Sequence, residues 1–329
     1  MTKKIDLLNI GLIALSLIIA IMLPFRLFLF SYAILGPLHY LTEINWLKDK
    51  NYFLSQNSPW VKFFVIIAVL ATIYPLYMLF ENGWGVMLDE MMDIFKGKGK
   101  VLILTAFFFS IGLFIFKKRN HLILALLGSF LLAILLKSYL PAWLFFIGLF
   151  LPTIVHVYLF TGLFMLYGSK RAKSRYGYMA VAALFIVPFI IAYLPIDPTT
   201  YVVTREVGET YNESKFLNLN GVLTKMFNGF VNGKFMVLSP VGIKVQIFIA
   251  FAYTYHYLNW FSKTSIIGWR DSLNKKSSLY IGVLWVAAVG LYLYDFYTGL
   301  VALYFLSILH VLFEFPLNVV TIKALFRPA

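Results

Sequence analysis

Long apolar runs separated by short polar segments make up almost the whole chain. The hydrocarbon core of a bilayer is about 30 Å thick and takes roughly 20 helical residues to cross. Runs of about this length predict an all-α polytopic bundle of about ten transmembrane helices, forming one integral membrane domain over residues 1–329. The predicted spans are 6–23, 25–46, 60–80, 100–116, 120–138, 142–168, 176–194, 239–262, 278–294 and 297–322.

Composition and charge agree with a membrane protein. The chain is 61% hydrophobic and only 13% charged, and it has 28 Lys+Arg against 14 Asp+Glu, whereas soluble domains carry about 25% charged residues. Basic residues cluster at every second predicted helix end, which by the positive-inside rule places both termini in the cytoplasm. The exception is a group of three lysines that this topology places on the outer side, Lys96, Lys98 and Lys100. Because the basic excess is mainly a topology signal, we expect no nucleic-acid partner, and we predict an integral protein of a bacterial inner membrane.

Two connections are long enough to fold locally. Residues 81–99 combine apolar and acidic positions at helical spacing, which predicts a short interfacial helix or loop. Residues 195–238 are predicted to form an outer loop, in which 216–230 has the character of a short capping helix.

Ionisable residues inside the predicted spans are few, and four of them are histidines. His39, His156, His256 and His310 fall on the second, sixth, eighth and tenth predicted helices. All four helices run from outside to inside in the predicted topology, and all four histidines lie at or below the midplane. An ionisable group at this depth marks a functional site by default. His121 begins a helix beside basic residues and is interpreted as interfacial.

Two of these histidines are followed one turn later by a glutamate. Glu43 follows His39 and Glu314 follows His310, and residues at i and i+4 share a helical face. Each glutamate is therefore a candidate metal ligand, or a catalytic base or hydrogen-bond acceptor beside the metal. The alternative is a pair of local His–Glu contacts that only satisfy each other.

Polar side chains near the histidines are candidates for supporting roles. Asn259, three residues after His256, is the preferred one, together with Tyr40 and Tyr255. Pro37, Pro152 and Pro316 flank site positions, and prolines bend membrane helices and free backbone carbonyls.

The chain has no cysteine, which excludes thiolate metal sites, iron–sulfur clusters and disulfides. Imidazole and carboxylate ligands suit Fe(II), Zn, Mn or Cu. The residues alone leave four functions open: a non-haem iron enzyme that uses dioxygen, a zinc-dependent lipid hydrolase, a proton- or metal-coupled transporter, and a haem-binding membrane protein.

The histidine neighbourhoods resemble those of the Brp/Blh family of membrane beta-carotene dioxygenases. That family has an early Gly-x-x-His with an acidic residue four positions on, further transmembrane histidines, and a last Leu-Pro-His. Here Gly36-Pro-Leu-His39 with Glu43 is similar to the first motif, and His156, His256 and His310 follow in similar order. The last histidine follows Ile308-Leu309, without the proline.

The resemblance implies a non-haem Fe(II) oxygenase that acts on dioxygen and a carotenoid or other isoprenoid. The chain contains 33 Phe, and helices rich in such apolar side chains would admit a lipid-soluble substrate from the bilayer. Zinc is the alternative metal.

Overall fold

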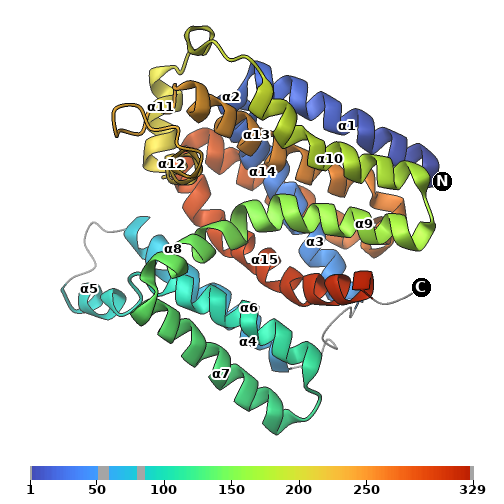
Figure 1. Ribbon diagram of the computed structural model, residues 1–329. Helices are drawn as coiled ribbons and strands as arrows, with labels where there is room; N and C mark the ends of the chain where they lie inside the picture. The colour runs from blue at the N-terminus through green and yellow to red at the C-terminus, as the bar shows by residue number, and fades with distance from the viewer. Residues whose placement is uncertain (1, 51–58, 80–85, 327–329) are drawn as a thin grey trace. The chain divides into compact units, whose positions relative to one another are not determined.

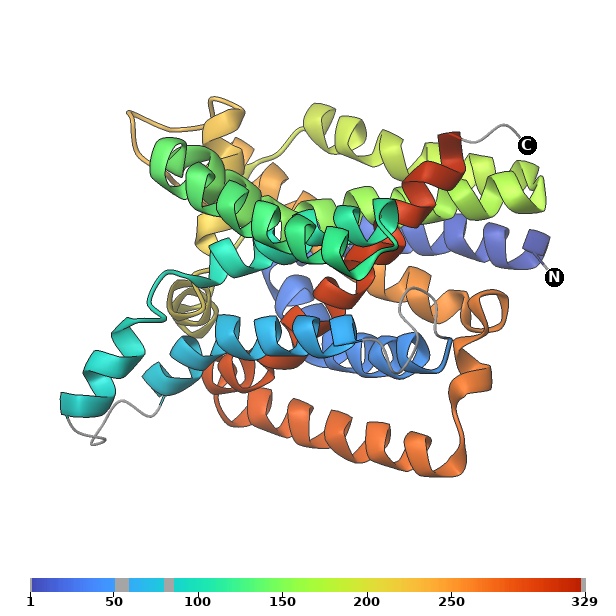
Figure 2. The same cartoon turned by 90° about the horizontal axis from the view of Figure 1, so that it is seen from below.

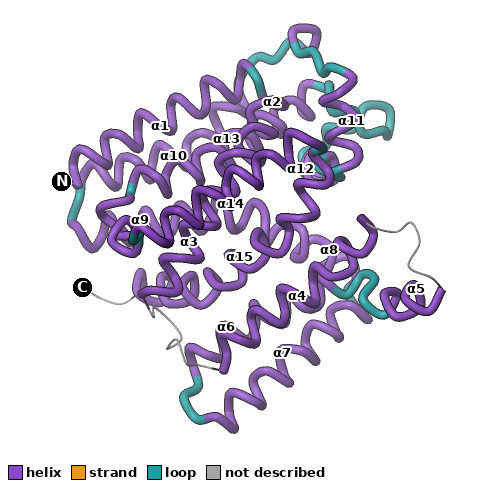
Figure 3. The backbone as a smooth tube through the Cα atoms, turned by 180° about the vertical axis from the view of Figure 1, so that it is seen from behind, coloured by secondary structure: helices purple, strands orange, loops and turns teal. Residues whose placement is uncertain are grey.

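The computed structural model describes residues 2–50, 59–79 and 86–326. Within these ranges the chain is helical with connecting turns and contains no β-strand, as the tube in Figure 3 shows. The all-α helical bundle predicted from the apolar pattern is confirmed.

Eight helices in the described ranges are long and apolar enough to cross a membrane, which indicates an integral membrane protein. The other two predicted spans, 100–116 and 239–262, also form helices, although the first is shorter and the second is not among the eight. The orientation of the termini stays a prediction. The eight candidates are Lys3–Met22, Pro24–Leu47, Trp60–Leu79, Arg119–Tyr139, Phe145–Ala172, Arg175–Tyr193, Lys275–Tyr294 and Phe296–Phe326.

The chain divides into two compact units. Unit 1 contains Met1–His39, Val157–Asp271 and Val283–Leu300, and unit 2 contains Tyr40–His156, Ser272–Gly282 and Val301–Ala329. Every boundary between them falls inside a helix, so the units are not consecutive folding domains along the chain. The single membrane domain over residues 1–329 stays a prediction.

Unit 1 is built around one buried helix, α13 (Pro240–Ser262), with α1 (Thr2–Met22) and α10 (Arg175–Tyr193) packed side by side (Figures 1 and 2). Its other elements are α2 (Pro24–Phe30), the π-helical η1 (Ser31–Leu35), α9 (Thr161–Ala172), η3 (Pro198–Thr200), α11 (Arg205–Glu213), α12 (Leu217–Met226), η4 (Thr264–Gly268), most of η5 (Trp269–Ser272) and most of α14 (Lys275–Tyr294).

Burial explains the composition of α13. Ile243, Ile247 and Phe251 are fully buried, and polar residues such as Gln246 and Thr254 are buried as well. The Gln246 amide donates to Tyr211, and the Thr254 hydroxyl shares a hydrogen bond with Ser31. A helix enclosed by protein can carry such groups because its neighbours supply their partners, and this lowers its hydropathy relative to helices that face lipid.

Unit 2 has its own apolar core, centred on Phe64, Leu104, Phe109, Leu312 and Phe315. These residues come from α4 (Pro59–Leu79), α6 (Gly99–Ile115) and α15 (Phe296–Phe326). The unit also contains most of α3 (Gly36–Lys50), α5 (Val86–Asp93), α7 (Arg119–Tyr139), α8 (Pro141–Phe150), the first part of the π-helical η2 (Leu151–Phe160) and the start of α14 (Lys275–Tyr294).

Large apolar side chains cover the outer faces of several spans. On α7 Leu124 is 65% exposed, and on α14 Leu279 and Val286 are 68% and 64% exposed. Water solvates such continuous apolar faces poorly, whereas lipid tails, which are themselves apolar, solvate them well. These faces therefore indicate contact with a lipid bilayer.

Local helices form in both predicted connections. Within 81–99 the helix α5 forms, while residues 81–85 lie outside the described ranges. Within 195–238 the chain forms α11 and α12, and α12 coincides with the short helix predicted over 216–230. The side of the membrane on which these segments lie stays a prediction.

The two π-helical segments that carry or precede a predicted ligand adjoin prolines. The segment η1 ends just before Pro37 and His39, and η2 contains Pro152 and His156. Proline has no N–H for the helical ladder, so the turn beside it can widen. Such wide turns occur often at functional sites because they turn side chains out of the regular α-helical register.

Candidate metal centre

The six predicted metal-binding residues are all buried, with exposed fractions between 1% and 6%. They come from α3, η2, α13 and α15, and they are His39, Glu43, His156, His256, His310 and Glu314. His121, interpreted from sequence as interfacial, is exposed at the start of α7. The burial of six ionisable side chains in an apolar bundle requires specific partners for them.

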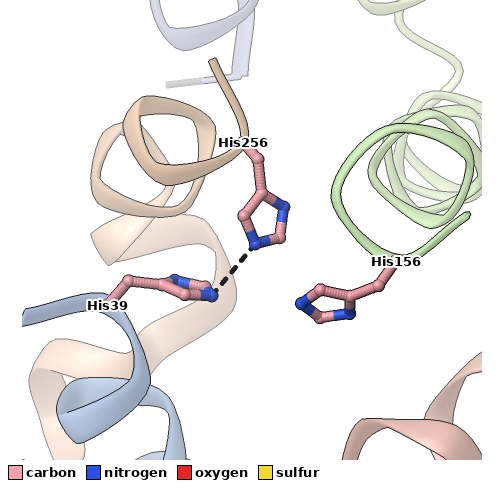
Figure 4. A group of neighbouring side chains, drawn as sticks. All are labelled: His39, His156 and His256. Carbon is pink, nitrogen blue, oxygen red and sulfur yellow. Dashed lines mark hydrogen bonds between the residues drawn. The ribbon is translucent and has the colours of Figure 1, made fainter. Parts of the chain in front are cut away.

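In unit 1, His39 and His256 form a facing pair. Their Nε2 atoms lie 3.1 Å apart and their ring centroids 4.6 Å apart. Figure 4 shows the ring of His256 pointing toward that of His39, drawn together with His156 from η2. The pair lies deep in protein, because α13 is the buried centre of the unit.

The approach of α3 to α13 depends on a small residue. A Cβ at Gly36 would lie 3.2 Å from the hydroxyl oxygen of Tyr257, which is a tight contact. Tyr257 and Trp260 of α13 also pack against His39, with ring centroids 5.3 Å and 5.4 Å from its own. These aromatic contacts limit rotation of the His39 ring.

Thr161 joins His256 to the backbone of η2. The Thr161 hydroxyl oxygen lies 3.0 Å from the carbonyl oxygen of Val157, to which it can donate its single hydrogen. The same oxygen lies 2.7 Å from Nδ1 of His256 and accepts from that nitrogen when its own hydrogen is directed to Val157. In neutral His256 the lone pair is then on Nε2, the atom that faces His39.

In unit 2, His156 and His310 form a second facing pair with the same separation. Their Nε2 atoms lie 3.1 Å apart, and Nδ1 of His156 lies 2.6 Å from a carboxylate oxygen of Glu314. This contact is an ion pair when His156 is protonated, and when His156 is neutral with its hydrogen on Nδ1 the lone pair is on Nε2. This arrangement is the carboxylate–histidine pairing found beside metal ions in proteins.

The geometry of both pairs fits a metal ion. Two nitrogen ligands about 2.1 Å from a metal lie about 3 Å apart when they subtend roughly a right angle, close to the 3.1 Å found in each pair. Among the described residues, five belong to buried groups that could hold a metal ion: His39, Glu43, His156, His256 and His310. The residue types and their burial are thus compatible with a bound cation.

The carboxylates add to this argument. Glu43 and Glu314 are both buried in unit 2. Burial of a carboxylate in a medium of low dielectric favours its protonation or a nearby positive charge. A bound cation or a protonated His156 beside Glu314 would supply such a charge.

The predicted supporting residues differ in their positions. Tyr40 stacks on His310, with ring centroids 5.7 Å apart. Tyr255 donates to Oδ1 of Asn9 and contacts the sulfur of Met165. Asn259 is buried on α13.

Sequence reasoning missed Thr161 and Trp260, which contact the histidines directly. Thr161 lies five residues after His156, and its partner His256 is far away in the sequence. Trp260 lies four residues after His256, so helical spacing from that histidine is the signal that could have drawn attention to it.

In comparisons with known proteins, no family model, curated protein or solved structure matches this chain. The class that the fold and the site define is therefore an integral membrane protein with buried His and Glu groups able to hold a metal ion.

Thr161 provides a test of the tautomer assignment. We expect Thr161→Val, which keeps the shape and removes the acceptor, to lower metal affinity by about 10-fold, the lower end of effects for groups that orient a ligand. Thr161→Ser should retain affinity because it keeps the hydroxyl. Competition titration of Co²⁺ on purified protein measures both, and equal affinities of the two variants would refute the assignment.

Proposed function

We propose that this chain is a membrane-embedded, metal-dependent oxygenase that acts on a lipid-soluble substrate such as a carotenoid or other isoprenoid. The proposed metal is non-haem Fe(II), with His39, His156, His256 and His310 as ligands, in the cytoplasmic half of a bacterial inner membrane. Glu314 orients His156, and Glu43 is the remaining carboxylate available as a ligand or base.

The observation that carries the proposal is the repeated histidine pair. In each unit two Nε2 atoms face each other at 3.1 Å, and in each pair Nδ1 of one ring lies within 2.7 Å of an oxygen of Thr161 or Glu314. A ring with its hydrogen on Nδ1 presents an Nε2 lone pair, which can accept a hydrogen bond from the facing ring or bind a cation. Fixing the tautomer prepares Nε2 to bind a cation.

Iron held by histidines with open positions supplies dioxygen activation. The chain's own residues hold the ligands in place, exclude water and position the substrate. Thr161 and Glu314 hold the ligand rings, Tyr257 and Tyr40 pack against them, and the buried apolar bundle keeps water from the reacting groups. The proposed overall reaction adds the two atoms of dioxygen across one conjugated C=C bond and gives two carbonyl products.

The sequence resemblance to the Brp/Blh family supports this choice among the metal-dependent functions. The pair geometry argues against haem held between partners of one pair. Two axial nitrogen ligands on opposite sides of one iron lie about 4 Å apart, twice a metal–nitrogen bond of about 2 Å. A separation of 3.1 Å is too short and leaves no room for a porphyrin between the rings.

Expression in a carotenoid-producing bacterial host tests the function. We expect loss of pigment and the appearance of carbonyl cleavage products in organic extracts, in aerated cultures only. A matched strain expressing His156→Ala at the same level should keep its pigment. Unchanged pigment with the wild-type chain would contradict a carotenoid substrate, and oxygen-independent turnover with bound zinc would favour a lipid hydrolase instead.

A further inference from the structure

Asn318 of α15 carries a buried side-chain amide. Its side chain is 2% exposed, and among the described residues neither its nitrogen nor its oxygen finds a hydrogen-bond partner. An amide offers two donors and two acceptor sites. Leaving such a group unpaired inside a protein is destabilising enough that each case calls for an explanation.

A second buried asparagine shows what full pairing looks like in the same molecule. Asn220 of α12 is also fully buried, and its amide nitrogen donates to the carbonyl oxygen of Gly242 and to the side chain of Gln246. Its oxygen accepts a hydrogen bond from Thr224. The fold can thus satisfy a buried asparagine where the residue has a structural role, and it does not do so at Asn318.

The position of Asn318 connects it to the candidate metal centre. It follows His310 and Glu314 at intervals of four residues on α15, so the three residues share one helical face. At about 1.5 Å per residue, Asn318 lies about 12 Å along the helix from His310 and about 6 Å from Glu314. The amide is therefore on the metal-binding face and displaced toward the C-terminal end of the helix.

We propose that Asn318 binds the polar end of the substrate, and that the substrate is an isoprenoid lipid carrying a hydroxyl or carbonyl oxygen. This inference rests on the proposed function of the same site. A hydroxyl pairs with both the oxygen and the nitrogen of an amide, and a carbonyl pairs with its nitrogen. A site built to hydrogen-bond an oxygen group discriminates strongly against an analogue that lacks it.

The proposal also defines where the substrate reacts. With its oxygen group at Asn318, the conjugated bond near the metal lies about 12 Å from that group, the axial distance from Asn318 to His310. A substrate made only of hydrocarbon would leave the Asn318 amide unpaired. It would therefore bind without a hydrogen bond to fix its position along α15.

Binding measurements on purified protein in lipid nanodiscs test the inference separately from catalysis. The probes are zeaxanthin, which carries ring hydroxyls, and beta-carotene, which has the same polyene without oxygen. We expect the wild-type chain to bind zeaxanthin about 5- to 150-fold more tightly, the range for one buried hydrogen bond. Asn318→Leu should abolish this preference and leave beta-carotene binding unchanged or tighter.

Thermal unfolding provides the second readout. Asn318→Leu should leave the Tm unchanged or raise it, because it replaces an unpaired amide by an apolar group of similar size. Asn220→Leu should lower the Tm, because it leaves Gly242, Gln246 and Thr224 without their partner. Equal losses of Tm in the two variants would show that Asn318 is a structural residue and would overturn the proposal.

Equal binding of the two carotenoids by the wild-type chain would overturn it as well. A preference for zeaxanthin without any oxygenation would instead leave the binding role intact and contradict the proposed function.

Discussion

Replacing His256 by alanine is expected to lower the affinity of the purified protein for Fe²⁺ or Co²⁺ by at least about 100-fold. This exceeds the 10- to 100-fold range for residues that only orient a ligand, because the substitution removes a proposed ligand, whose Nδ1 lies 2.7 Å from the Thr161 hydroxyl oxygen. It also leaves His39 without the nitrogen that lies 3.1 Å from its own Nε2. Competition titration against a chelator of known affinity measures the effect.

His121→Ala is the matched control. His121 is exposed at the start of α7 and is not among the buried residues that could hold a metal ion. Its substitution should leave the affinity unchanged within error. If the His256 and His121 variants bind metal equally well, the candidate centre is not a metal site, even if both variants fold normally.

Glu314→Leu should lower metal affinity by about 10- to 100-fold. The carboxylate oxygen lies 2.6 Å from Nδ1 of His156 and is the neighbour that can hold a hydrogen on that nitrogen. Leucine removes the acceptor from a buried imidazole, so the neutral ring is free to place its hydrogen on Nε2, which then cannot bind a metal. Affinity and oxygenase activity should fall together.

Glu314→Gln separates orientation from charge. The Gln carbonyl oxygen can still accept from Nδ1 of His156, but it carries no negative charge. We expect an affinity between those of the wild type and the leucine variant, with folding judged by the Tm. A glutamine variant as weak as the leucine variant would mean that charge, rather than the hydrogen bond, is the contribution of Glu314.

The helices could be predicted well from sequence because a bilayer imposes a length and a hydropathy on each spanning segment. Segments such as 120–138 and 176–194 correspond closely to α7 and α10. The division into two compact units could not be predicted in this way, because its boundaries fall inside continuous helices such as α3 and α15. The length and hydropathy of an apolar run indicate that the segment spans the membrane, but they carry little information about which helices pack together.

The candidate ligands could be found because ionisable groups are rare in the apolar spans. Their pairing could not, since it depends on tertiary contacts. Spacing along α15 associated Glu314 with His310, whereas the structure pairs Glu314 with His156 of η2. Thr161 and Asn318 were also missed, because their importance comes from the presence or the absence of a partner in the folded chain.

The most direct test of the metal centre is elemental analysis of wild-type protein purified without added metal, alongside the alanine variants of His39, His156, His256 and His310. The proposal predicts close to one iron per chain in the wild type and its loss in each of the four variants, as expected for histidine ligands of one non-haem iron. Wild-type protein that carries zinc and almost no iron, or variants that keep the wild-type iron content, would contradict it.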